Sequence, residues 1–456
     1  MMRLSQVKKI LNAELIGQDV SFDAVSTDSR TLPRDSLFVA LTGENFDGHN
    51  FIEDALKKGA KAILVAQKEV VPQSASALLV ADPIEALAKL ARFHRAQFSI
   101  PCIGVTGSCG KTTVKSMIGA ILSRVGKTLI SQGNFNNHIG LPLTLFNLKK
   151  EHQFIVVEMG ASAPLEIAYL GQVAQPTIAL ITNVHNAHLS GFGSLENVAK
   201  TKAEIYEALD TDGVAILNHD SPYAAFWQKI IGFRKTVTFG IHKPAAIKAD
   251  KIHYNHFKTA FRVATPKEQF EVTLNLPGEH NVQNALAAIA CIYHLNIPKA
   301  LIQEALYAYQ GVPGRLTPHE LSNGIQLIDD TYNAIPDAVE AAIEVLAKSE
   351  HEKLLVMGDM AELGVHSEMF HERMGAKAKK VGIDHLWAVG PLSQSMVKAF
   401  GVQGRWFASK AELMAELKKI DKPMTILIKG SRSSGMEELV DGLLLSRKAS
   451  YAASAR

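Results

Sequence analysis

The sequence predicts an α/β protein of three domains: a small α/β N-terminal domain, a central domain built on a mostly parallel sheet, and a C-terminal doubly wound domain. Its 456 residues are too many for one hydrophobic core and suggest about three. From Ile100 onward, short apolar runs rich in β-branched residues alternate with segments whose apolar residues recur every three or four positions. This alternation is typical of parallel strands joined by helices that cover both faces of a sheet.

The composition is that of a folded globular protein, with 47% hydrophobic and 20% charged residues. Lys and Arg (48) nearly balance Asp and Glu (45), and no basic run occurs, which argues against nucleic acid or a membrane surface as partner. The three cysteines, Cys102, Cys109 and Cys291, are scattered and fit a reducing cytoplasm. The N-terminus has no apolar signal core, and the most apolar helical stretch, 285–295, is too short to span a bilayer. We therefore expect a cytoplasmic protein without membrane insertion.

Residues 1–82 form the first predicted domain, with strands expected over 36–41, 62–66 and 77–80 and a helix over 51–58. Two polar loops interrupt it, at 26–30 and 42–49. Arg30 beside the hydroxyl of Ser29 could hold a diphosphate, but the residues alone favour an ordinary turn. Asp82-Pro83 is the predicted boundary, because Pro83 suits the first position of a helix that runs to Ala96.

A glycine-rich turn follows the strand expected over 100–105 and opens an amphipathic helix. Gly107 and Gly110 allow a tight turn whose N–H groups face one point, together with the positive end of the helix. We interpret the turn as a phosphate-binding loop, in which Lys111 reaches the outer phosphates and the Thr112 hydroxyl binds Mg²⁺. The turn consists of Gly107, Ser108, Cys109, Gly110, Lys111, Thr112 and Thr113.

Two features of this turn leave alternatives open. Only Ser108 and Cys109 separate the glycines, where the general motif has four residues, so a plain glycine-rich turn is the alternative. Cys109 is best interpreted as a small filler, although a helix N-terminus can depress a thiol pKa. On that ground we expect alkylation to inactivate the protein and bound nucleotide to protect it.

Two further polar side chains follow strands of the same predicted sheet. Glu158 ends the strand 154–157, and His188 follows the strand 177–184. Because strand carboxyl ends share one edge of a parallel sheet, both should lie near Thr112 as metal ligands. The alternatives are a solvated carboxylate and a loop histidine. Lys202, in the helix expected over 198–209, is by itself an ordinary solvated charge.

The pattern changes after Gly213. Residues 236–239 and 251–276 suggest an antiparallel patch, and 278–284 opens an alanine-rich buried helix. Asn281 and Asn284 share a face of that helix, where they could bind a base edge or cap the helix.

Residues 311–315 are predicted to be a hinge, after which four strand–helix pairs indicate the third, Rossmann-like domain. Polar clusters again follow its strands. The strands are expected over 325–328, 354–357, 386–389 and 425–428, and the clusters are 329–333, 358–362 and 429–433.

Taken together, these motifs resemble those of the Mur ligases along nearly the whole chain. The short phosphate loop of that family matches 106–112, which explains why the spacing of the two glycines departs from the general motif. The resemblance implies an ATP-dependent, amide-forming ligase with an ATPase-like central domain. It also implies two Mg²⁺ ions held by Thr112, Glu158, His188 and a carbamylated Lys202, so that Lys111, Glu158, His188 and Lys202 act in catalysis.

Other blocks match the nucleotide side of the family. Asn281 and Asn284, preceded by His280, match the adenine-side pattern, and Arg315 matches the hinge arginine. Asp330 and Asn333, with Tyr332 between them, match the ribose and phosphate side.

The substrate side resembles the family member that adds D-alanyl-D-alanine to UDP-N-acetylmuramoyl-tripeptide. Its signature blocks look like 358–364 and 429–432, and no Asp-Asn-Pro-Arg motif of the diaminopimelate-adding relative occurs. Two positions depart from the family, Ile335 in place of Asn and His138 in place of an acid. The resemblance assigns the following residues to the two substrates: Ser29, Arg30, Asn137, Ser431 and Arg432.

The sequence therefore predicts three domains, residues 1–82, 83–312 and 313–456. We expect the protein to be a monomer. Because the phosphate loop and the pair Arg315 and Asp330 belong to different domains, we predict ligand-driven closure about the hinge. Rival interpretations are a folylpolyglutamate-type ligase and a nucleotide-switched binding module without chemistry.

Overall fold

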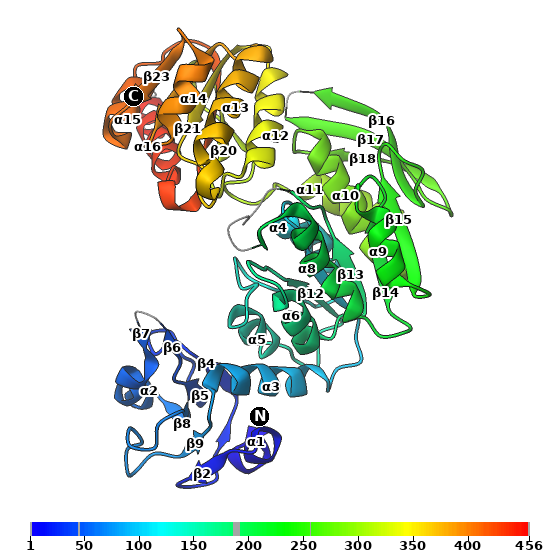
Figure 1. Ribbon diagram of the computed structural model, residues 1–456, viewed down its shortest axis with the longest axis vertical. Helices are drawn as coiled ribbons and strands as arrows, with labels where there is room; N and C mark the ends of the chain where they lie inside the picture. The colour runs from blue at the N-terminus through cyan, green and yellow to red at the C-terminus, as the bar shows by residue number, and fades with distance from the viewer. Residues whose placement is uncertain (1, 44–45, 186–191, 256, 455–456) are drawn as a thin grey trace.

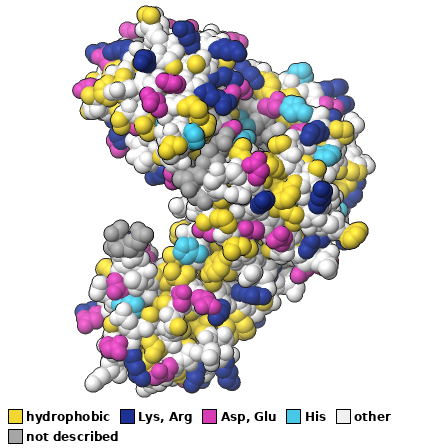
Figure 2. Space-filling model, viewed as in Figure 1, with side chains coloured by type: hydrophobic (Ala, Val, Ile, Leu, Met, Phe, Trp, Pro, Cys, Tyr) yellow, Lys and Arg dark blue, Asp and Glu magenta, His cyan; other side chains and the backbone are white. Residues whose placement is uncertain are grey.

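The computed structural model describes residues 2–43, 46–185, 192–255 and 257–454, with side chains through Ser446. Three lobes follow one another along the chain, and the central lobe lies between the N-terminal and C-terminal lobes (Figure 1). In the space-filling view the surface is hollowed between the first and the last lobe (Figure 2). The predicted three-domain α/β class is confirmed.

In the described N-terminal part, the main sheet has the strand order β2-β9-β8-β5-β4. Its strands β4, β5, β8 and β9 are parallel, while β2 joins β9 antiparallel. The elements are β1 (Met2–Arg3), α1 (Leu4–Leu11), β2 (Glu14–Ile16), β3 (Ser21–Phe22), β4 (Ala24–Ser26), β5 (Ser36–Val39), β6 (Thr42–Gly43), β7 (Phe46–Asp47), α2 (Ile52–Lys57), β8 (Ala60–Val65) and β9 (Ala77–Leu79).

Helix α3 (Pro83–Arg95) connects this lobe to the central one. The Asp82 carboxylate accepts from the backbone N–H of Ile84 and Glu85, so the helix begins at Pro83 as predicted. At its other end, the buried Arg95 guanidinium donates to the carbonyls of Ala174 and Gln175. The helix is thereby fixed to the central domain.

The central sheet has the order β11-β12-β10-β13-β14-β15-β16-β17-β18 in the described chain. It is parallel from β11 to β16, and β16, β17 and β18 are antiparallel. The strands are β10 (Cys102–Thr106), β11 (Thr128–Ile130), β12 (Phe154–Glu158), β13 (Ile178–Ile181), β14 (Val214–Asn218), β15 (Lys235–Gly240), β16 (Ile247–Asn255), β17 (Lys258–Ala264) and β18 (Gln269–Leu274).

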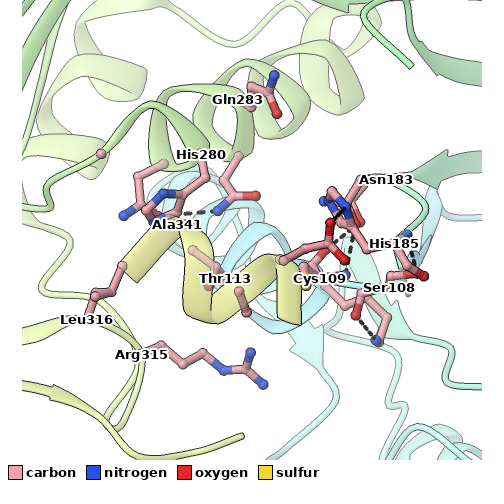
Figure 3. A pocket seen from close by; sticks show the side chains of 18 of the residues that line it. Ser108, Cys109, Thr113, Asn183, His185, His280, Gln283, Arg315, Leu316 and Ala341 are labelled. Carbon is pink, nitrogen blue, oxygen red and sulfur yellow. Dashed lines mark hydrogen bonds and ion pairs between the residues drawn. The ribbon is translucent and has the colours of Figure 1, made fainter. Parts of the chain in front are cut away.

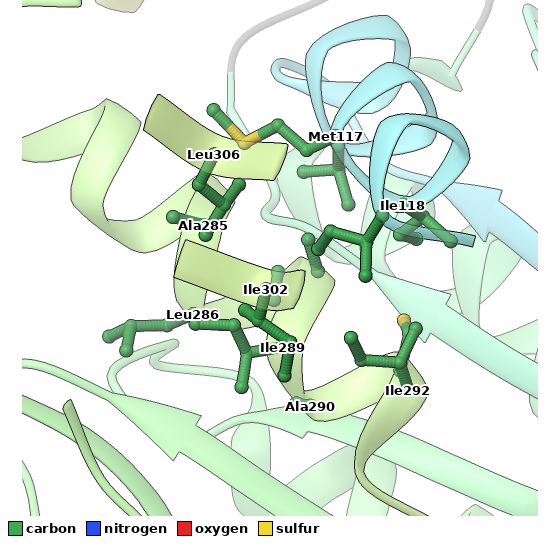
Figure 4. Close-up of a cluster of buried hydrophobic side chains, with 14 of the residues drawn as sticks. Met117, Ile118, Ala285, Leu286, Ile289, Ala290, Ile292, Ile302 and Leu306 are labelled. Atoms are coloured by element: carbon green, nitrogen blue, oxygen red, sulfur yellow. The ribbon is translucent and has the colours of Figure 1, made fainter. Parts of the chain in front are cut away.

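Helices cover both faces of this sheet. Side chains of α4, α10 and α11 form one buried cluster, and Figure 4 shows Met117 and Ile118 of α4 facing Ile289 and Ile302. Side chains of α5, α6, α8 and α9 form the cluster on the other face. The helices are α4 (Lys111–Leu122), α5 (Gly140–Leu145), α6 (Glu166–Ala174), α8 (Leu195–Glu207), α9 (Ala224–Ile231), α10 (Glu279–Ile292) and α11 (Lys299–Ala308).

One expectation for this domain is wrong. Residues 236–239 belong to β15, which pairs parallel with both β14 and β16 and is not part of the antiparallel patch. The mixed polar and apolar residues of this short run do not reveal strand direction, which is set by the crossover through α9.

The C-terminal sheet has the order β19-β20-β24-β21-β22-β23, parallel except for the edge strand β19. The four predicted strand–helix pairs are present, and the prediction missed the short strands β19 and β23. The elements are β19 (Thr317–Glu320), β20 (Ile325–Asp330), α12 (Pro336–Ala347), β21 (Glu352–Met357), α13 (Ser367–Lys380), β22 (His385–Val389), α14 (Ser393–Phe400), β23 (Gly404–Phe407), α15 (Lys410–Leu417), β24 (Met424–Lys429) and α16 (Glu437–Ser454).

Within the described residues, none of the helices combines the length and the apolar character needed to cross a bilayer.

Candidate active site

A pocket of about 550 Å³ lies between the central and C-terminal domains. Its lining includes the turn after β10, the end of β13, the start of α10, the ends of β20 and β24, and one face of α12 (Figure 3). The two domains also touch at its rim, where His185 Nδ1 lies 3.4 Å from Asp337 Oδ1. Polar groups from distant segments thus converge on one cavity, as the positions of the strand ends predict.

The turn after β10 has the conformation of an anion-binding loop. Gly107 and Gly110 have φ of +145° and +79°, and a side chain at Gly107 would overlap the Thr182 hydroxyl. The loop is fastened to the end of β13, because Asn183 Oδ1 accepts from the Cys109 N–H at 2.8 Å. Lys111 curls back over the loop, its Nζ donating to the Gly107 carbonyl at 2.8 Å. The Lys111 ammonium therefore lies over the loop, next to the N-terminus of α4.

Cys109 lies in the wall of the pocket. Burial raises the pKa of its thiol, and the nearby Lys111 and Lys429 ammonium groups only oppose that rise. Desolvation outweighs the local positive charge, which agrees with the interpretation of Cys109 as a small filler, and the expected inactivation by alkylation stays a prediction.

Glu158 is held on both of its carboxylate oxygens. Oε1 accepts from Asn136 Nδ2 at 2.8 Å, and Oε2 accepts from the Thr112 hydroxyl at 2.8 Å and lies 3.3 Å from Lys115 Nζ. Burial would raise the pKa of this carboxyl, but the Lys111 and Lys115 charges and the two hydrogen bonds outweigh it, so the pKa lies below its usual value. Glu158 is therefore an anion whose Oε2 is directed at Thr112 and whose Oε1 is directed at Asn136.

Lys202 lies on α8 with only 3% of its surface exposed. Burial, together with repulsion from Lys111, lowers its pKa to about 7. With this pKa, about half of the amine is uncharged at neutral pH, so Lys202 is not an ordinary solvated charge. His188 lies outside the described residues.

Asn281 and Asn284 both line the pocket at the start of α10. Asn284 Nδ2 donates to Asn281 Oδ1 at 3.2 Å, and Asn281 Nδ2 donates to the Pro277 carbonyl. The expected shared face is present, and Asn281 also stabilises the chain entering the helix. Beside them, burial and the Lys429 charge lower the pKa of His280 to about 4, so this imidazole is neutral.

The C-terminal domain contributes Arg315, Asp330 and Asn333 to the same pocket. The Arg315 guanidinium lies 4.0 Å above the Tyr332 ring and donates to the Thr112 hydroxyl at 3.0 Å. Its buried Nε has no acceptor among the described residues. Asp330 pairs with the buried Lys429 at 2.6 Å. A cation with an unused donor, aimed at a phosphate-type loop, fits an anionic ligand.

The residues expected to bind the two substrates do not lie in this pocket. Arg30 is 83% exposed and pairs bidentately with Asp28, and Ser29 is on the same distant lobe. Asn137 Oδ1 accepts from the N–H groups of Ile139 and Gly140, so it caps α5. Ser431 and Arg432 follow β24, where the Arg432 guanidinium pairs with Glu437.

Four residues contribute to the site although the sequence analysis assigned none of them a role there. They are Lys115, Asn136, Asn183 and Lys429. Lys115 carried a detectable signal, because a lysine four positions after Lys111 lies on the same helical face as the loop. The asparagines had none, since their contacts are made across strands far apart in the sequence.

The donor set suits a hard divalent cation. The Thr112 and Glu158 oxygens lie 2.8 Å apart, Glu158 lines the pocket, and Mg²⁺ prefers oxygen donors. Among the described residues, no cluster of three His, Cys, Asp or Glu side chains occurs.

Comparison with known families assigns the class. The Mur ligase middle domain matches residues 105–292, the glutamate ligase domain of Mur ligases matches 314–432, and the Mur ligase family catalytic domain matches 21–95. The chain belongs to the Mur ligase family and is an ATP-dependent, amide-forming ligase.

Its relatives narrow the class further. UDP-N-acetylmuramoyl-tripeptide–D-alanyl-D-alanine ligase of Escherichia coli (strain K12) is 43% identical over 96% of this chain and 98% of the relative. A crystal structure of MurF from Acinetobacter baumannii superposes with a TM-score of 0.90 at 34% identity, covering 96% of this chain and 98% of that one. The MurF ligase of Thermotoga maritima, solved in complex with ADP, has a TM-score of 0.83 at 30% identity, covering 92% and 96%.

Proposed function

We propose that this protein joins D-alanyl-D-alanine to UDP-N-acetylmuramoyl-tripeptide at the expense of ATP, giving the UDP-muramoyl-pentapeptide for peptidoglycan synthesis. One observation carries the proposal: a relative with this activity in its name matches 96% of the chain at 43% identity. The pocket supports it, because its phosphate loop, cations and carboxylate suit phosphoryl transfer to an acid.

The chemistry solves a leaving-group problem. A carboxylate does not form an amide with an amine in water, because its oxygen leaves poorly. The tripeptide carboxylate attacks the γ-phosphorus of ATP, ADP leaves, and an acyl phosphate results. The amine of D-alanyl-D-alanine then attacks the acyl carbon, a proton is lost, and inorganic phosphate leaves. Positioning and charge neutralisation carry most of such a reaction.

Different residues of the pocket would bind the phosphates, the metal, the base and the ribose. The N–H groups of residues 107–113 that do not donate to Asn183 would hold the β- and γ-phosphates together with the Lys111 ammonium, and Arg315 would bring its free Nε to the same oxygens. Thr112 and Glu158 would hold one Mg²⁺, which neutralises phosphate charge. Asn281, Asn284 and the neutral His280 would bind the base, and Asp330 and Asn333 the ribose side. The ADP complex of the Thermotoga maritima relative supports a nucleotide here.

Lys202 is proposed to carry a carbamate. Its pKa of about 7 leaves much of the amine uncharged, and only the uncharged nitrogen can attack carbon dioxide and lose a proton. The product is an anionic oxygen donor where an ammonium would repel a metal. With Glu158 and His188 it would hold the second Mg²⁺, near the substrate carboxylate.

The domains are assigned accordingly: residues 1–82 bind the UDP substrate through Ser29 and Arg30, residues 83–312 bind ATP, and residues 313–456 bind the dipeptide through Ser431 and Arg432. Asn137 of the central domain would also contact a substrate. We propose a monomer working in the cytoplasm, where ATP is available.

The test is an amide-forming assay on the purified protein. UDP-N-acetylmuramoyl-tripeptides with diaminopimelate or lysine at the third position are offered with D-alanyl-D-alanine, and a folate with glutamate is offered in parallel. We expect pentapeptide, ADP and phosphate in equal amounts from one of the tripeptides and no reaction with the folate. ATP consumption without pentapeptide would contradict the proposal.

A further inference from the structure

Lys115 is a buried cation that the proposed reaction does not use. It lies on α4 one turn after Lys111, with 2% of its surface exposed. Its Nζ donates to the Gly133 carbonyl at 3.2 Å and lies 3.3 Å from Glu158 Oε2. Lys111 and Glu158 line the pocket, whereas Lys115 is outside the described lining, behind Glu158. Burying a lysine is costly unless its charge is paired, so this ion pair has a specific role.

The pair changes the charge at the proposed metal site. Three cations surround Glu158: Lys111 and Lys115 act on it directly, and Arg315 contacts the neighbouring Thr112 hydroxyl at 3.0 Å. Immediately around Glu158, one carboxylate therefore faces three cations, and the local charge in the nucleotide-free protein is positive. Such a site attracts a polyphosphate and repels a free divalent cation.

Lys115 also competes with a metal for one oxygen. Glu158 Oε2 already accepts from Thr112 and faces the Lys115 ammonium, and Oε1 is taken by Asn136. A metal ion arriving alone would meet an oxygen whose charge is already compensated. A metal arriving with a nucleotide brings phosphate oxygens that take up Lys111 and Arg315.

We propose that Lys115 is the internal counter-ion of Glu158, which keeps divalent ions out of the nucleotide-free site and makes metal binding depend on the nucleotide. This inference rests on the assignment of Thr112 and Glu158 as metal ligands in the proposed function. Lys115 touches neither the nucleotide pocket nor the reacting atoms, so it is a positioning residue that acts through Glu158.

The experiment measures binding by calorimetry, with Mn²⁺ standing in for Mg²⁺. Mn²⁺ alone and the preformed Mn²⁺ complex of a non-hydrolysable ATP analogue are titrated into the full-length wild type and into Lys115→Met. We expect the wild type to bind the complex at least about tenfold more tightly than Mn²⁺ alone. Lys115→Met should bind Mn²⁺ alone at least about tenfold more tightly than the wild type does.

Three further variants separate the causes. Lys127→Met removes an equal charge from an exposed lysine paired with Glu151, and it should bind Mn²⁺ as the wild type does. Lys115→Arg keeps the charge and should keep Mn²⁺ binding weak. In a Glu158→Gln background, Lys115→Met should have no effect, because the two residues act as one unit.

Two results would overturn the inference: wild type that binds Mn²⁺ alone as tightly as the complex, or Lys115→Met that binds Mn²⁺ no better than Lys127→Met. If Lys115→Met fails to fold in a thermal melt, a wild type that binds Mn²⁺ alone as tightly as the complex still overturns the inference. Failure of every variant and the wild type to bind the complex would instead reject the nucleotide site itself, and with it this inference.

Discussion

At the scale of single residues, the pKa and the role of each buried lysine of the site depend on what surrounds its amine. Lys111, Lys115 and Lys202 all have lowered pKa values because burial disfavours the ammonium. Their partners differ: Lys111 contacts loop carbonyls and Lys115 contacts Glu158. The same side chain is thus suited to phosphate binding in one place and to charge compensation in another.

Replacing Lys202 tests its proposed carbamate. Lys202→Ala should abolish turnover, lowering kcat by at least about a thousandfold, because the second metal loses an oxygen ligand. Small carboxylic acids such as acetate should partly restore the rate by occupying the vacated space. The measurement is ADP release with and without acid, with exposed Lys200→Ala on the same helix as the control. Full activity of the wild type prepared free of carbon dioxide would contradict the carbamate.

The unmodified lysine should also leave a signature in the pH dependence of stability. Its folded-state pKa of about 7 lies below the ordinary 10.5. Between those values the unfolded chain binds more protons, so the free energy of unfolding rises with pH from about 7 to 10 and is lowest below 7. In carbon dioxide-free buffer, Lys202→Met should flatten this rise in denaturant titrations, whereas Lys200→Met should not. Parallel profiles for the two variants would refute the lowered pKa.

At the scale of elements, the connection from α11 to β20 places the C-terminal cation in the central pocket. Gly314 has φ +75°, its N–H donates to Asp329, and its carbonyl accepts from the Tyr332 N–H. A Cβ there would lie 3.2 Å from the Tyr332 nitrogen. The turn therefore fixes Arg315 against the Tyr332 ring.

Gly314→Ala should displace Arg315 and lower kcat/KM for ATP about tenfold, because phosphoryl transfer depends on the position of that cation. The matched control is Gly382→Ala, because Gly382 has φ +82° but no described heavy atom within 4 Å of the place that a Cβ would take. It should cost about 1 kcal/mol of stability through backbone strain alone and leave kcat/KM unchanged. Equal kinetic effects of both substitutions would show that contact at Gly314 is unimportant.

At the scale of the whole molecule, the central and C-terminal domains already share a pocket, whereas the N-terminal lobe with Ser29 and Arg30 stands apart from it (Figure 1). A substrate held by its uridine diphosphate on that lobe must bring its far carboxylate to the phosphate loop. We therefore predict a second movement besides closure about the hinge, in which the N-terminal lobe turns about α3 toward the pocket.

Small-angle scattering should detect this movement. The radius of gyration should fall when a non-hydrolysable ATP analogue and both substrates are added together, because closure excludes water that would hydrolyse the acyl phosphate. The analogue alone should lower the radius of gyration less, since the central and C-terminal domains that would bind it already adjoin. Equal radii with and without the full set of ligands would reject closure.

Much of the fold and of the nucleotide site could be predicted from local sequence. Strand runs ending in Glu158, Asp330 and Lys429, and the glycines at 107 and 110, determine where polar groups emerge, since hydrophobic period and turn chemistry are local properties. The short strands β19 and β23 and the direction of β15 were not predictable, because pairing partners decide them.

By itself, the sequence determined the α/β class and the family, and it predicted the phosphate loop, because these depend on motifs whose residues lie close together in the chain. Only the tertiary structure decided the protonation and pairing of the site: the raised pKa of Cys109, the near-neutral pKa of Lys202 and the burial of Lys115 against Glu158. The physical reason is that desolvation and charge pairing depend on what packs around a group, and those neighbours come from segments far away in the sequence.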